Sequence, residues 1–287
     1  MEAYLIAIST LWGIQILLTL GLYLQFGLAG LVNFGHVAGY GLGAYAAAIV
    51  TTAGGHWLWG FVGGVLLSVA FATGLGAATL RLRGDYFAIA TLGLAEVIRL
   101  FITNAHGITR GPLGIPGIAR PAIGVWKLDE PLAFLAMVGV LAGVAYVFCE
   151  LVSRAPLGRT LRAIRDDEVA AAALGKDVFR LRVLAARLGA ILSAVAGGLW
   201  AHYVTYVSPE QFTAEITFNT WIALLLGGTR GPVGAVVGSA GLLVLLEGSR
   251  FLRDVIAVLD EPRMAAMRQV LVGLGLIVVP AYMRKGM

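Results

Sequence analysis

The chain has 287 residues, of which 59% are hydrophobic and 13% charged, and it carries a formal net charge of +5. Together with a mean hydropathy of +0.87, this composition excludes an ordinary soluble domain and places the chain among integral membrane proteins. The single cysteine, Cys149, excludes an internal disulfide. We attribute the basic excess to membrane topology and expect no nucleic-acid partner, because Lys and Arg gather in the cytoplasmic loops of membrane proteins.

Long apolar segments predict the fold class. Several reach the ~20 residues that a helix needs to cross a bilayer, and the clearest are 3–20, 57–80, 131–152 and 183–204. We predict an all-α integral membrane protein, a polytopic helical bundle of about 8–10 transmembrane helices in a single domain over residues 1–287. About nine crossings, with the N-terminus outside and the C-terminus inside, place most Lys and Arg on the inner side.

Regularly spaced glycines mark the second apolar stretch. Gly35, Gly39 and Gly43 recur every fourth residue and therefore line one face of a helix. Such a ridge of small residues lets another backbone approach closely. The polar residues Asn33 and His36 interrupt the apolar run where the ridge begins. We predict a broken or re-entrant helix at this point, although tight packing alone would also explain the glycines.

A second interruption lies at 227–234, where Pro232 is suited to the start of a helix. Non-helical backbone at membrane depth is tolerated where it is buried in protein or lines a cavity, and paired interruptions point to the binding sites of transporters. We therefore predict that both interruptions belong to a substrate pathway or gate. The candidate residues in the first interruption are Asn33, His36 and Gly39.

Ionisable residues also occur inside predicted spans. Within 84–104, helical spacing puts Glu96 and Arg99 on one polar face. Charges at membrane depth are costly and usually point inward. The two residues form either part of the substrate pathway or a structural ion pair that locks this helix to a neighbour, and we favour the ion pair. Glu215 and Asn219, four residues apart, form a second polar patch with the same two interpretations.

Patterns typical of enzymes are missing from the sequence. A GxxxxGK[ST] phosphate-binding loop does not occur, so the chain is not by itself a P-loop ATPase. A GxSxG nucleophile motif is absent as well. The histidines at positions 36, 56, 106 and 202 lack the spacing of metal ligands. We therefore expect a protein that is not an enzyme and that holds no metal or cofactor.

Residues 154–182 are densely charged in an otherwise apolar chain and must lie in water. An acidic run at 166–168 precedes the alanine-rich stretch 169–174, and Gly175 follows it. Acidic residues in the first turn and glycine just past the end are typical of a short capped helix. We predict about two turns of helix that form a cytoplasmic docking surface. A solvated linker is the alternative.

Short motifs spread along the chain form a specific combination. They are GLVNFGH at 30–36, GLGAY at 41–45, LRGDYFA at 82–88, LRAIRDDE at 161–168, SPE at 208–210 and LGG at 226–228. Together they resemble the permease family of branched-chain amino acid ABC importers, and specifically its M-type subunit. The resemblance implies an ABC importer permease fold and ATP-driven uptake of branched-chain or other hydrophobic amino acids by alternating access.

The resemblance also implies an assembly in the inner (plasma) membrane of a bacterium or archaeon. The implied partners are a second homologous permease, two cytoplasmic ATP-binding subunits and a periplasmic or extracellular substrate-binding protein, which would dock on the outer loops 106–131 and 204–213. The charged insert would then be the coupling loop that an ATPase subunit receives. The residues assigned to this coupling are Arg162, Arg165, Asp166, Asp167, Glu168, Ala171 and Gly175.

Two other functions remain open at this point. Urea and short amides use permeases closely similar to this one, so the same assembly could carry a different cargo. A channel or an ion-coupled secondary transporter would use Glu96, Arg99 and Glu215 as an ion relay. Uptake without any ATPase subunit would distinguish this last class from the importer.

Overall fold

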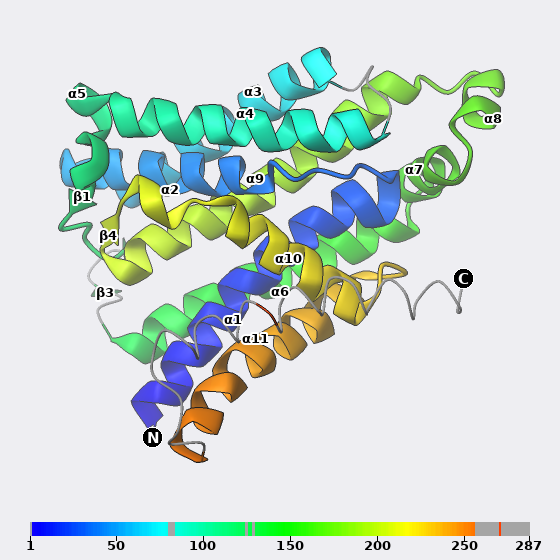
Figure 1. The fold of residues 1–287 in the computed structure, drawn as a ribbon. Coiled ribbons are helices and arrows are strands. Elements are labelled where there is room, and N and C mark those ends of the chain that lie inside the picture. The colour runs from blue at the N-terminus through cyan, green and yellow to red at the C-terminus, as the bar shows by residue number, and fades with distance from the viewer. Residues whose placement is uncertain (1, 80–83, 124–125, 128–129, 256–269, 271–287) are drawn as a thin grey trace.

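The computed structural model describes residues 2–79, 84–123, 126–127, 130–255 and 270. Helices dominate this part of the chain (Figure 1), as predicted for an all-α membrane protein. The elements are α1 (Glu2–Leu22), the π-helix η1 (Tyr23–Leu28), α2 (His36–Thr52), α3 (Trp57–Thr79), α4 (Gly84–Asn104), α5 (His106–Thr109), η2 (Gly111–Leu113), β1 (Ile115–Pro116), β2 (Ala122–Ile123), β3 (Trp126–Lys127), α6 (Pro131–Arg154), α7 (Pro156–Asp166), α8 (Glu168–Ala173), α9 (Val178–Val204), β4 (Tyr206–Val207), η3 (Pro209–Gln211), α10 (Ala214–Gly227) and α11 (Pro232–Val255).

Five helices of the described chain are long and apolar enough to cross a membrane, and a bent pair of helices makes a sixth candidate. Three of the four clearest predicted spans lie within these helices, and the fourth coincides with α3 up to Thr79. α2 has 17 residues and falls just short of the ~20 expected for a full crossing. The predicted total of about nine crossings includes one beyond residue 255, outside the described residues, so the total and the orientation stay predictions.

α2 lies in the interior of the bundle and packs closely against α3 and α9. A Cβ atom added to Gly43 would lie 2.6 Å from the Cα of Ala194, and one added to Gly197 would lie 2.8 Å from the carbonyl carbon of Tyr40. On the α3 side, a Cβ atom at Gly64 would lie 2.8 Å from the Cα of Gly43. Gly43 therefore allows the close backbone approach predicted for the glycine ridge, whereas Gly35 precedes α2 as its N-cap residue and does not join the helix face.

α1 crosses the middle of the molecule and contacts α9 on one side and both α6 and α11 on the other (Figure 1). At one end of the bundle, the two predicted outer loops meet each other. β1 pairs antiparallel with β4, with Ile115 opposite Val207, and β2 pairs with β3. The first loop is thus irregular but ordered where it is described, and it shares a surface with the second.

Both predicted interruptions are present. The first span ends with η1 at Leu28, and the chain then runs without helix until α2 begins at His36, turning at Gly30 with a φ of 68°. The second lies between α10 and α11, whose segments Pro209–Gly227 and Pro232–Glu247 are bent by 117°. Pro232 starts α11 as predicted.

Candidate functional site

Buried polar side chains hold the first break in place. The Asn33 side chain accepts a hydrogen bond from the backbone N–H of Gly35 (2.8 Å) and donates one to the Gln25 side chain (2.9 Å). Gln25 in turn donates to the carbonyl of Ala186 on α9 (3.1 Å), and the Trp221 indole donates to the Asn33 carbonyl (3.2 Å). The break is therefore satisfied inside this chain, as non-helical backbone at membrane depth requires.

Two threonines from distant helices satisfy backbone N–H groups where α2 begins. The first N–H groups of a helix have no acceptor within the helix, and the N-cap residue, Gly35, has no side chain to supply one. Instead, Thr217 of α10 accepts from the N–H of Val37 (3.0 Å), and Thr91 of α4 accepts from the N–H of Phe34 (3.1 Å). The start of α2 thus depends on the positions of α4 and α10.

The other predicted pathway residues of this region are packed within the chain. The Nε2 atom of His36 lies 3.1 Å from the carbonyl oxygen of Leu18, so this nitrogen carries the proton and ties α2 to α1. Ser193 donates to the His36 carbonyl (3.0 Å), and a Cβ atom added to Gly39 would lie 3.3 Å from the Ser193 side chain. His36 and Asn33 are both buried. Their part in a substrate pathway stays a prediction.

Glu96 and Arg99 form an ion pair on the outward face of α4. The Nε atom of Arg99 lies 3.0 and 2.9 Å from the two carboxylate oxygens of Glu96. The side chain of Glu96 is 47% exposed and that of Arg99 is 26% exposed. The favoured ion pair is thus present, but it lies within one helix. Its part in holding α4 to a neighbour stays a prediction.

The second polar patch lies on α10. Glu215 is exposed, whereas the side-chain oxygen of Asn219 is buried and accepts no hydrogen bond from the part of the chain that the structure describes. Thr217, which caps α2, lies between them in sequence, and Trp221, which contacts Asn33, follows within one turn. Because residues two apart on a helix point to opposite sides, the predicted patch lies on the far side of α10 from the contacts of Thr217 and Trp221 with the first break.

The charged insert forms two helices, α7 and α8, and this result rules out the solvated linker. Asp167 is the N-cap of α8 and accepts a hydrogen bond from the N–H of Ala170 (2.9 Å). Gly175 follows the helix with a φ of 77°, a conformation that favours glycine. α8 has six residues, fewer than the predicted two turns, because Asp166 ends α7 instead of joining the first turn of α8.

Several contacts fix the insert to the membrane helices. Leu161 and Ile164 of α7 and Ala171 of α8 are buried. Glu168 forms an ion pair with Arg182 of α9 at 2.9 Å. The remaining surface of α8 is exposed: Val169 is 79% exposed, and Leu174, the C-cap residue, is 80% exposed.

The family model for the branched-chain amino acid transport system permease component matches residues 4–280. The chain belongs to this permease family. It is 36% identical over 263 residues to the high-affinity branched-chain amino acid transport system permease protein LivM of Salmonella typhimurium, with 83% of this chain and 61% of that protein covered. It is 25% identical over 249 residues to LivH of the same organism, with 80% and 79% covered.

The permease therefore spans about three fifths of the length of the LivM protein that it matches. Among solved structures, it is similar to a chain described as an inward-facing conformation of a metal-chelate type ABC transporter. That match has a TM-score of 0.48 and 14% identity and covers 96% of this chain and 84% of the other.

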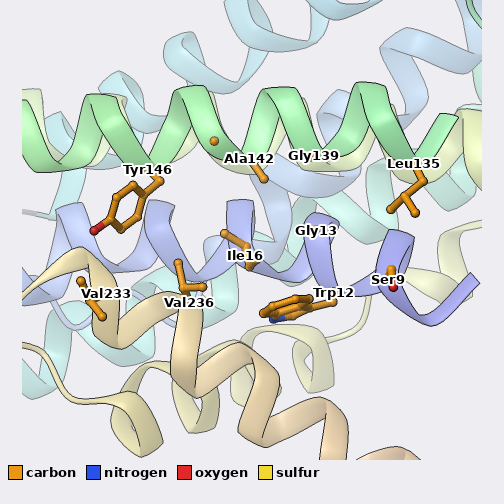
Figure 2. Close-up of a pocket in the computed structure, with 11 residues that line it drawn as sticks. Ser9, Trp12, Gly13, Ile16, Leu135, Gly139, Ala142, Tyr146, Val233 and Val236 are labelled. Atoms are coloured by element: carbon orange, nitrogen blue, oxygen red, sulfur yellow. The ribbon is translucent and has the colours of Figure 1, made fainter. Parts of the chain in front are cut away.

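A cavity of about 500 Å³ lies between α1, α6 and α11 of the permease. Figure 2 shows that its walls are mostly apolar, with Trp12, Ile16, Leu135 and Val236 among the lining side chains. None of the predicted pathway residues lines it. The lining residues that the structure describes also carry no charged side chain. We therefore do not assign the substrate pathway to this cavity.

Sequence reasoning missed the partners of the break. Gln25, Thr91, Thr217 and Trp221 carry its hydrogen bonds, yet each lies on a helix with no motif that marks it. A polar residue in an apolar span was the one available signal, and Gln25 and Thr217 carry it.

Proposed function

We propose that the permease is the membrane-spanning subunit of an ATP-driven importer for branched-chain or other hydrophobic amino acids. The observation that carries the proposal is the family match over residues 4–280, together with the 36% identity to LivM. ATP is hydrolysed by separate subunits, since the sequence has no GxxxxGK[ST] loop. The assembly lies in the inner (plasma) membrane of a bacterium or archaeon, and the subunit works by alternating access.

α8 is the part that an ATPase subunit receives. It is a short capped helix held against the bundle by Ala171 and by the ion pair between Glu168 and Arg182. The exposed surface at its start combines the charges of Asp166, the last residue of α7, and of the N-cap Asp167 with the exposed apolar side chain of Val169. Large apolar residues exposed among charges favour a protein contact over free solvent. ATP-driven closure of the ATPase subunits would move this helix.

The outward face of α4 supports a contact with a second, homologous permease. Ile89 and Leu100 on α4 are 69% and 47% exposed and lie on the same side of the helix as Glu96, which pairs with Arg99. Hydrocarbon would leave this ion pair poorly solvated, and water would leave the apolar side chains exposed. A protein partner with a polar pathway at the interface would solvate the ion pair and cover the apolar side chains. A LivH-like subunit is the proposed partner, because Salmonella typhimurium has both a LivM and a LivH and this chain matches the LivM more closely.

The paired strands β1 and β4 support the docking of a substrate-binding protein. They join the two predicted outer loops into one surface at the end of the bundle. Leu113, next to β1, is 82% exposed, and its carbonyl accepts a hydrogen bond from the Tyr206 hydroxyl (3.1 Å). A binding protein that contacts this surface would deliver substrate between the two permeases.

Reconstitution in proteoliposomes with the partner permease, the ATPase subunits and the binding protein tests this function. We expect leucine uptake that requires ATP and that is lost on triple charge reversal, D166K/D167K/E168K, while the subunit still inserts. The double variant K176E/R180E changes charges of the same insert outside α8 and is expected to retain uptake. Undiminished uptake by the triple variant contradicts the coupling role of α8. Uptake without the ATPase subunits favours an ion-coupled transporter.

A further inference from the structure

Two arginines of α7 cap the ends of two membrane helices. Arg162 donates to both the hydroxyl and the carbonyl oxygen of Ser153, in the last turn of α6 (3.0 and 2.9 Å). Arg165 donates to the carbonyl oxygen of Gly27, in the last turn of η1 (2.6 Å). The last carbonyls of a helix lack donors within the helix, and a cation there also interacts favourably with the helix dipole. One short helix therefore holds the ends of two spans.

Gly27 is also the point where the two helix breaks meet. A Cβ atom added to Gly27 would lie 3.2 Å from the carbonyl oxygen of Thr229, in the second break. Three residues later, Gly30 turns the chain with a φ of 68°, and a Cβ atom there would lie 2.8 Å from the Cγ atom of Arg165. Arg165 therefore packs against the first break, and its guanidinium holds the carbonyl that adjoins the second.

The position of Arg165 follows the position of α8. The N–H of Asp167 donates to the Ala163 carbonyl of α7 (2.9 Å), and the Asp167 carbonyl accepts from the N–H of Ala171 in α8 (3.1 Å). The guanidinium of Arg165 is also held by the carboxylate of Asp166 (3.0 Å). Because a single residue connects the two helices, a displacement of α8 carries the end of α7 and its arginine with it.

We propose that Arg165 is the positioning residue that transmits movement of α8 to both helix breaks. The proposal rests on the proposed function, in which an ATPase subunit contacts α8. When α8 moves, Arg165 shifts the Gly27 carbonyl and with it the end of η1 and the adjoining backbone at Thr229. The π-helical form of η1 suits this role, because π-helices are rare and frequently occur at functional sites.

The first test is the number of substrate molecules imported per ATP hydrolysed by the complete transporter in proteoliposomes. We expect R165M to hydrolyse ATP at about the wild-type rate but to import about tenfold less substrate per ATP, because one charge-assisted hydrogen bond is lost. R165K should recover at least half of the ratio, since its ammonium can still donate to the Gly27 carbonyl. The matched control R180M removes a cation of the same insert whose ion pair within the described residues is with Asp177, three positions away.

The second test measures the breaks directly in the permease purified alone. The variant T229C is labelled with a water-soluble maleimide, and Cys149 stays in place because it is fully buried. We expect R165M to raise the labelling rate at position 229 about threefold or more, because the contact beside Gly27 loosens, and R180M to leave it unchanged. Equal labelling rates of T229C alone, T229C with R165M and T229C with R180M overturn the proposal. This measurement needs no transport, so it separates Arg165 from the function of the whole assembly.

The two tests distinguish the possible failures. If the unsubstituted transporter shows no ATP-dependent uptake, the proposed function is wrong. If it takes up substrate normally and R165M keeps the wild-type ratio, only the role of Arg165 is wrong. Should R165M fail to assemble, the ratio is measured on D166N, which removes the carboxylate that holds the guanidinium and is expected to lower the ratio about twofold. An unchanged ratio there also overturns the proposal.

Discussion

The substitution Gly43→Ala tests how closely α2 must approach α9. The added Cβ atom would lie 2.6 Å from the Cα of Ala194, about 0.8 Å short of the 3.4 Å at which ordinary van der Waals contact begins, and it would also meet the Ala194 carbonyl oxygen. These are backbone atoms, so no side chain can turn aside and α2 must move. Added methyl groups in a well-packed core typically cost about 1–3 kcal/mol, and a backbone clash belongs at the upper end of that range.

A matched control on α6 separates this clash from the general effect of replacing glycine in a helix. A Cβ atom at Gly139 would meet no atom within 4 Å, so G139A should keep or slightly raise the stability, because alanine favours helix more than glycine does. The assay heats the purified permease in detergent to a series of temperatures. Size-exclusion chromatography then measures the fraction that stays folded after each temperature. G43A should unfold several degrees below the wild type. Equal unfolding temperatures for G43A and G139A would refute the close approach of α2 and α9.

Two further predictions concern the α2 cap and the docking surface. T217V should lower the free energy of unfolding by about 1–3 kcal/mol, because the N–H of Val37 loses its acceptor. T217S keeps a hydroxyl and should retain most of the wild-type stability. Equal stability of the two variants in thermal denaturation would contradict the cap. V169D/L174D should reduce co-purification of the ATPase subunit about tenfold, because it places charge on two exposed apolar positions, one in α8 and one at its C-cap. If as much ATPase subunit co-purifies with this variant as with the wild type, these side chains lie outside the contact.

Features set by neighbouring residues could be predicted from the sequence. The four-residue spacing of Gly39 and Gly43 indicates the helix face of α2 that packs against α9. Pro232 marks the start of α11, and Gly175 lies just past the end of α8. Each of these signals lies in the chain segment whose conformation it determines. The local physics of glycine, proline and capping residues is therefore sufficient to place them.

Contacts between distant segments could not be predicted in this way. Arg165 and Gly27 are 138 residues apart, and Val37 and Thr217 are 180 apart. Threonine and arginine side chains can form hydrogen bonds with many different groups, so residue type alone does not select the partner that is used. The sequence indicated a cytoplasmic role for Arg165 but not its contact with a membrane helix.

The location of the first break explains why its partners are so dispersed. Ending a span at Leu28 and restarting at His36 frees backbone groups that hydrocarbon cannot satisfy. Gly27 at the end of η1 receives Arg165 from α7, and the start of α2 receives hydroxyls from α4 and α10. Because the unsatisfied groups face different neighbours, several helices must be in place before the break is stable. A shift of any one of them then changes the free energy of the break, which is the property that a coupled gate requires.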